Sequence, residues 1–188
     1  MSDDPSDPSS DQPPSSDEPD SPRHGIGARD VKFLLDDELD DPPDAARLAG
    51  MLSRVVGELG AERCELRVVV VGDQRMTELH ERFAGVRRTT DVLTFDMGAG
   101  AGDGGVDGEI YVCWCEARRA AAGFAHSAED ELLLYAVHGL LHLMGHDDGD
   151  ETSHRIMHER EDELLSAIGL GATYHGETLV SDSGAGEG

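Results

Sequence analysis

One stretch in the C-terminal third of the chain constrains its fold more than any other. It reads HGLLHLMGHDD from residue 138 to residue 148. Residues four apart lie on one face of an α-helix, because a turn contains 3.6 residues, so His138 and His142 share a face. Gly145 is suited to end that helix, since glycine enters the left-handed backbone conformation at little steric cost. The stretch therefore predicts an apolar helix followed by a sharp turn.

The same stretch predicts a metal site. A neutral histidine ligates zinc through one ring nitrogen while the other donates a hydrogen bond. After a turn at Gly145, Asp148 can supply a third ligand and leave a fourth position open, as in catalytic zinc sites. His146 is the alternative third ligand, although only three residues separate it from His142. The predicted ligands of one zinc ion per chain are therefore His138, His142 and Asp148, in a zincin-like site.

This helix has two alternative interpretations. A core helix can carry two hydrogen-bonded histidines that bind no metal. Zinc proteases of this spacing carry a glutamate directly after the first histidine, where it activates water. This chain has Gly139 at that position, which argues against a protease.

Charge is distributed unevenly along the chain. The net charge is −25, from 40 acidic and 15 basic residues. Residues 1–22 hold seven acidic residues and no lysine or arginine, which leaves −18 on the rest of the chain. Such a segment buries too little apolar surface to offset its ordering entropy. We expect a disordered acidic tail over 1–28, one domain over 29–179 and a flexible tail over 180–188. The acidic domain opposes non-specific binding to nucleic acid.

Targeting signals are not apparent in the sequence. The chain opens without a basic region followed by an apolar run, and no stretch reaches the ~20 apolar residues of a membrane span. Three cysteines without a C-x-x-C pair are typical of a reducing compartment. The expected location is the cytoplasm, with no membrane partner.

Apolar periodicity predicts the order of elements. Strands are expected at 31–35, 64–71, 91–95 and 109–115, and helices at 45–59, 73–83, 116–124, 127–144 and 151–168. A glycine-rich loop is expected over 98–107. This order predicts an α+β domain: a four-stranded mixed sheet packed with helices, with the metal motif on a central helix.

Three segments resemble one known family. The stretch 138–148 resembles the signature H-G-x-L-H-L-x-G-[YH]-D-H of the YbeY-type endoribonucleases, which are bacterial rRNA maturation factors. Residues 90–95, TDVLTF, resemble the family's P-T-D-V-L-S-F strand, and residues 108–112, GEIYV, resemble its G-D-I-V-I strand. The resemblance covers roughly residues 31–168.

The resemblance implies a function. It implies a cytoplasmic, zinc-dependent, single-strand-specific endoribonuclease. Such an enzyme would act in maturation of the 16S rRNA 3′ end and in ribosome quality control. Its partners would be rRNA and the small ribosomal subunit.

The chain departs from the family pattern at two positions. Asp148 stands where the family has its third histidine, and Ala84 stands where it has an arginine. Arg87 and Arg88 are the candidates to replace that arginine in charge stabilisation or RNA contact. These departures keep open a non-enzymatic ribosome assembly factor with a structural metal, and less favourably a zinc metalloprotease.

Overall fold

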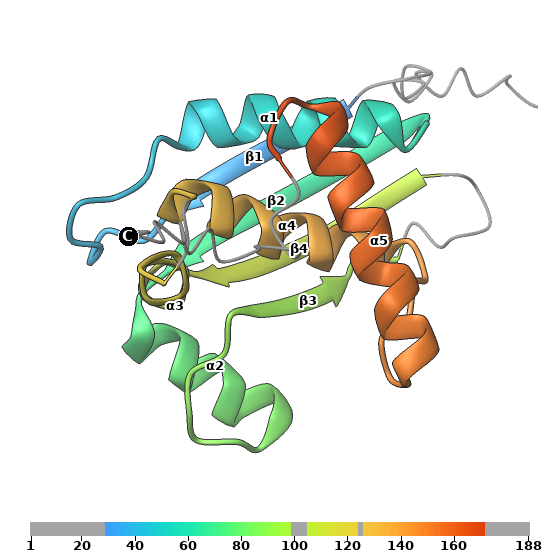
Figure 1. Ribbon diagram of the computed structural model, residues 1–188. Helices are drawn as coiled ribbons and strands as arrows, with labels where there is room; N and C mark the ends of the chain where they lie inside the picture. The colour runs from blue at the N-terminus through green and yellow to red at the C-terminus, as the bar shows by residue number, and fades with distance from the viewer. Residues whose placement is uncertain (1–28, 99–104, 124–125, 172–188) are drawn as a thin grey trace, which may run out of the picture.

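The computed structural model describes residues 29–98, 105–123 and 126–171 (Figure 1). The two predicted tails, and the predicted end of the domain after residue 171, lie outside these residues. The elements in chain order are β1 (Arg29–Leu35), α1 (Ala45–Glu58), β2 (Arg63–Val71), α2 (Asp73–Ala84), β3 (Val92–Asp96), β4 (Gly105–Cys113), α3 (Trp114–Ala121), α4 (Ala128–Leu143) and α5 (Glu151–Ala167).

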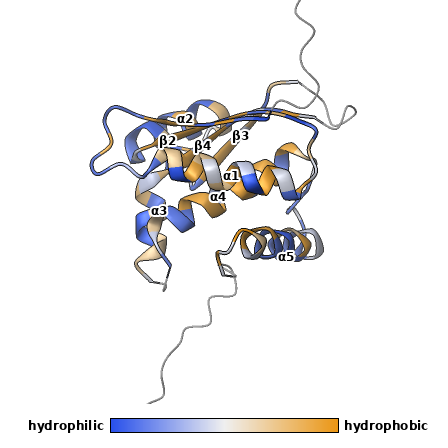
Figure 2. Cartoon of the chain, turned by 90° about the horizontal axis from the view of Figure 1, so that it is seen from above, coloured by the Kyte–Doolittle hydropathy of each residue, from blue (hydrophilic) through white to orange (hydrophobic). Residues whose placement is uncertain are grey.

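The strands form one mixed sheet in the order β1-β2-β4-β3. β1, β2 and β4 run parallel to one another, whereas β3 pairs antiparallel with β4 at the edge. Helices α1, α4 and α5 lie on one side of the sheet, and α2 lies on the other (Figures 1 and 2). The predicted α+β class with a four-stranded mixed sheet is confirmed.

Helix α4 runs through the centre of the core. Its side chains include six that are fully buried: Leu132, Leu133, Ala136, Val137, Leu140 and Leu141. Figure 2 shows stretches of this helix coloured as hydrophobic. Ser127 caps its N-terminus by accepting a hydrogen bond from the backbone N–H of Asp130, whose side chain accepts one from Ser127 in return. Gly145, at φ 88°, ends the helical region as predicted.

α4 approaches the sheet unusually closely at Gly139. A Cβ atom added there would lie 2.9 Å from Cγ2 of Ile110 and 3.0 Å from Oγ1 of Thr94. Real Cβ atoms essentially never have contacts below 3.0 Å. A glycine therefore lets the helix lie against β3 and β4, and this packing fixes the height of the neighbouring histidines above the sheet.

Several element boundaries differ from the prediction, most of all those of β4 and α3. β4 begins at Gly105 rather than at residue 109, because it pairs with β2 along its whole length, from Arg63↔Gly105 to Val71↔Cys113. This pairing outweighs the low strand propensity of the glycines. β4 ends at Cys113, and α3 already begins at Trp114. α2 begins at Asp73, as predicted, and Gly72 is its N-cap.

None of the helices in the described part of the chain has the length and apolarity that a membrane crossing requires.

Candidate metal centre

The candidate site lies where α4 ends and the chain turns back toward α5. Asp147 shapes this turn, because its Oδ1 accepts hydrogen bonds from the backbone N–H groups of Asp148 at 2.9 Å and Gly149 at 3.1 Å. Asp150 then caps α5 by accepting from the backbone N–H of Ser153 at 3.0 Å. The turn is thereby fixed at both ends, with Asp148 between them.

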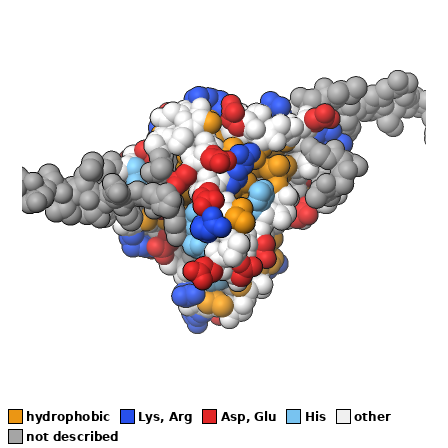
Figure 3. Space-filling model, turned by 45° about the vertical axis from the view of Figure 1, so that its right-hand side comes forward, with side chains coloured by type: hydrophobic (Ala, Val, Ile, Leu, Met, Phe, Trp, Pro, Cys, Tyr) orange, Lys and Arg blue, Asp and Glu red, His pale blue; other side chains and the backbone are white. Residues whose placement is uncertain are grey.

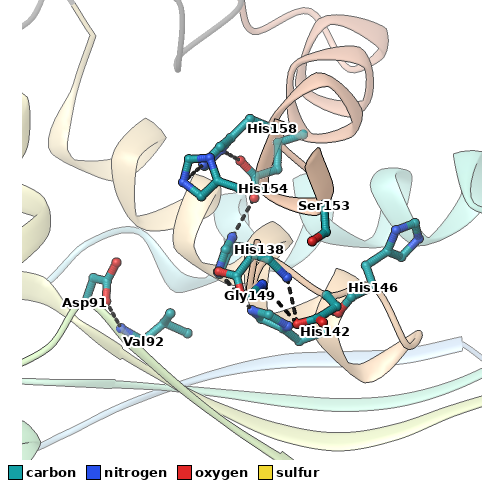
Figure 4. A network of polar contacts seen from close by, with 12 residues as sticks. Asp91, Val92, His138, His142, His146, Gly149, Ser153, His154 and His158 are labelled. Atoms are coloured by element: carbon teal, nitrogen blue, oxygen red, sulfur yellow. Dashed lines mark hydrogen bonds and ion pairs between the residues drawn. The ribbon is translucent and has the colours of Figure 1, made fainter. Parts of the chain in front are cut away.

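The side chains of His138, His142 and Asp148 lie close together at this turn. Figure 4 shows the two histidines of this group. Nε2 of His138 and Nε2 of His142 lie 3.1 Å apart. Oδ2 of Asp148 lies 3.6 Å from the first of these nitrogens and 3.8 Å from the second. Two atoms that each lie ~2.1 Å from a tetrahedral zinc ion are roughly 3.4 Å apart. The three ligand atoms are therefore spaced as such an ion requires, and they form a group that could hold a metal ion.

Hydrogen bonds to the opposite ring nitrogens orient both histidines. Nδ1 of His138 donates to Oε1 of Glu161 at 2.6 Å, and the Glu161 side chain is only 1% exposed. Nδ1 of His142 donates to the backbone carbonyl of His146 at 3.1 Å. With Nδ1 engaged in this way, Nε2 of each ring is the atom that remains for a metal.

The electrostatic environment of the cluster favours a cation. Burial lowers the pKa of His138, but the hydrogen bond and charge of Glu161, together with the charges of Asp148 and Asp91, outweigh it and raise this pKa above the usual value. Surroundings that stabilise a positive charge on the imidazole also stabilise a metal ion next to it. The donor set and its surroundings both fit a divalent metal.

The cluster is accessible from solvent. The side chains of His138, His142 and Asp148 are 20%, 30% and 36% exposed. Histidine atoms reach the surface among acidic, basic and apolar side chains on the side of the molecule that Figure 3 shows. A ligand position that faces solvent can be taken by water or a substrate oxygen, as catalytic sites require.

The alternative third ligand lies elsewhere. The ring of His146 points away from the cluster in Figure 4. The backbone of His146, and not its ring, supports the site. Its N–H donates a hydrogen bond to the carbonyl of Leu141 at 3.0 Å, and its carbonyl accepts one from Nδ1 of His142. The geometry thus favours Asp148 over His146.

The two candidate arginines follow α2. The Arg87 side chain is 82% exposed, and its Nε lies 3.8 Å from a carboxylate oxygen of Glu81. The backbone carbonyl of Arg88 accepts a hydrogen bond from Nδ1 of His80 at 2.8 Å. The contacts found among the described residues bring neither guanidinium to the cluster, and their predicted role stays a prediction.

The sequence alone did not reveal the role of Glu161, which orients His138. A signal was present, because Glu161 stands at helical spacing between Met157 and Leu164, which are buried positions of α5. A carboxylate is almost never fully buried unless it is paired. An acidic residue within an apolar stripe therefore predicts a buried partner, although it does not say which.

Fold and site together define a class of protein: an α+β domain whose central helix and following turn bring together two histidines and an aspartate that could hold a metal ion. The chain belongs to the family of endoribonuclease YbeY, whose family model matches residues 40–169. The resemblance predicted from three short segments is thereby confirmed.

Individual relatives agree with this assignment. The endoribonuclease YbeY of Thermobifida fusca is 35% identical over 133 residues, which cover 66% of this chain and 86% of the relative. That of Micrococcus luteus is 35% identical over 145 residues, covering 73% and 91%. A Thermotoga maritima protein of known solution structure has a similar fold, with a TM-score of 0.50 and 26% identity, covering 72% of this chain and 90% of its own.

Proposed function

We propose that this protein is a zinc-dependent endoribonuclease that cleaves single-stranded RNA, with His138, His142 and Asp148 as the ligands of the catalytic ion. The observation that carries the proposal is the convergence of these three side chains at zinc-ligand spacing on a solvent-accessible surface. Membership of the endoribonuclease YbeY family supports the choice of RNA as substrate.

Each residue has a distinct part in the proposed chemistry. A bound zinc ion supplies Lewis acidity toward a phosphoryl oxygen and lowers the pKa of water toward ~7. Glu161 holds His138 in the tautomer that leaves Nε2 for the metal, and the carbonyl of His146 does the same for His142. Asp147 is committed to the backbone of the turn, which supports a positioning role rather than that of a general base.

Support for the proposed cellular task comes from the family and not from the geometry. We propose that the substrate is rRNA, that the reaction matures the 16S rRNA 3′ end and serves ribosome quality control, and that the small ribosomal subunit in the cytoplasm is the partner. The net charge of −25 argues that such a partner is recognised locally and not by a long-range positive field.

Metal removal tests the activity. After dialysis against a chelator, cleavage of a single-stranded RNA should fall to background, because the three ligands then hold no ion. Zinc added back in equimolar amount should restore cleavage, and a casein digest run in parallel should stay negative. Full RNA cleavage by metal-free protein would contradict the proposal.

The arginines allow a graded test. If Arg87 or Arg88 replaces the family's arginine, alanine at that position should lower kcat for RNA cleavage by about 100-fold, the cost of losing one transition-state donor, with zinc content unchanged. Arg155→Ala on α5 is a matched control for loss of one exposed arginine, since Arg155 pairs only with Glu159 among the contacts described. Unchanged kcat in both variants would remove these arginines from the mechanism.

A non-enzymatic ribosome assembly factor is the second candidate function. It is favoured by one observation: α2 ends in Ala84, where the resembling family has an arginine. Such a factor would co-sediment with small ribosomal subunits but would leave RNA intact even when loaded with zinc.

A further inference from the structure

A second pair of histidines lies beside the first, on α5. His154 and His158 are four residues apart on this helix, and their Nε2 atoms approach to 3.0 Å. The corresponding distance in the α4 pair is 3.1 Å. The two pairs therefore repeat one arrangement: histidines at i and i+4, with the metal-binding nitrogens facing each other (Figure 4).

One buried carboxylate connects the two pairs. Oε1 of Glu161 accepts from Nδ1 of His138, and Oε2 accepts from Nδ1 of His158, both at 2.6 Å. Glu161 thus gives His158 the same tautomer that it gives His138. The two rings are stacked, with centroids 6.3 Å apart and planes inclined by 24°.

We propose that His154 and His158 form a second site, which binds a divalent transition metal such as zinc. Imidazole suits zinc, copper and nickel, and a second-shell carboxylate at Nδ1 is the usual support of a metal-ligating histidine. The 15% exposed side chain of His158 is preoriented, while His154 lies on the exposed surface of α5 and gives the ion access. With two protein ligands, the site leaves coordination positions to water or to an anionic oxygen.

The second site is independent of the first in its ligands, because none of His138, His142 and Asp148 belongs to it. It is coupled to the first through the Glu161 carboxylate and through the stacked rings of His138 and His158. Glu161→Gln keeps the side-chain shape but offers one acceptor oxygen in place of two. It should therefore lower the affinity of each site for its ion by about 10-fold or more.

Zinc stoichiometry on the full chain tests this. Metal-free protein is titrated with zinc and the bound ion counted by equilibrium dialysis. We expect two ions per chain for the wild type, one for His154→Ala, one for His158→Ala and one for His142→Ala. The double variant His142→Ala/His158→Ala should bind none. His80→Asn, which removes a histidine on α2, is the matched control and should bind two.

The single variants also separate a folding defect from a lost site. His154 is exposed, so its replacement should leave the fold intact, and the ion on α4 should keep its affinity. A wild type that binds one ion, or a second ion that persists in both His154→Ala and His158→Ala, would overturn the second site. If His142→Ala loses the ion on α4 and keeps one ion on α5, the second site is supported, whether or not the first site cleaves RNA.

Discussion

Replacing His142 with alanine should lower bound zinc by one ion per chain and reduce RNA cleavage by more than about 100-fold. Removal of even an outer-shell partner of a metal ligand typically costs 10–100-fold, and His142 would be a direct ligand. It also faces the other two predicted ligands, with its Nε2 3.1 Å from that of His138. Zinc content and initial cleavage rates on one single-stranded RNA measure both effects.

Two neighbouring residues serve as comparison variants. His146→Ala should keep both zinc and cleavage, because this ring points away from the cluster and only its backbone supports His142. Asp148→Ala should lose zinc affinity as His142→Ala does. If His146→Ala loses the ion while Asp148→Ala keeps it, the assignment of the third ligand is wrong.

Replacing Gly139 with glutamate should unfold or strongly destabilise the protein and should not create a protease. The substitution produces the H-E-x-x-H sequence of zinc proteases. However, position 139 is buried against Ile110 and Thr94, with 2.9 Å to the nearest side-chain atom from a Cβ alone. An uncompensated buried charge costs about 3–5 kcal/mol. For a chain of this size, that lowers Tm by about 10 °C. Thermal unfolding followed by circular dichroism measures the shift.

Gly139→Ala separates the steric effect from the charge. One methyl group in a filled core costs about 1–3 kcal/mol, and alanine returns about 1 kcal/mol of helix propensity relative to glycine. The Tm of Gly139→Ala is therefore expected to lie only a few degrees below that of the wild type. A glutamate variant as stable as the wild type would contradict the close packing of α4 on the sheet.

The sequence predicted much of the fold because its strongest patterns are local. The histidine spacing and the glycine stop both lie within α4 and its turn, and the capping residue Ser127 directly precedes the helix that it caps. The four consecutive valines of β2 are likewise a local pattern, and they lie within the strand predicted over 64–71.

What the sequence did not reveal depends on contacts between distant segments. The extent of β4 is set by its pairing with β2, some 40 residues earlier, and not by its own glycines. Glu161 was missed because its role depends on His138, 23 residues away on another helix. From the sequence, Gly139 indicated only that the glutamate of zinc proteases is absent. The structure adds a steric reason for glycine at this position, because Ile110 leaves no room for a side chain.

Crystals grown with zinc and measured at the zinc absorption edge would locate the ion itself. We expect an anomalous peak at the end of α4, about 2.0–2.2 Å from Nε2 of His138, Nε2 of His142 and a carboxylate oxygen of Asp148. A zinc-loaded crystal with no peak at this position, or with His146 in place of Asp148 as ligand, would contradict the proposed metal site.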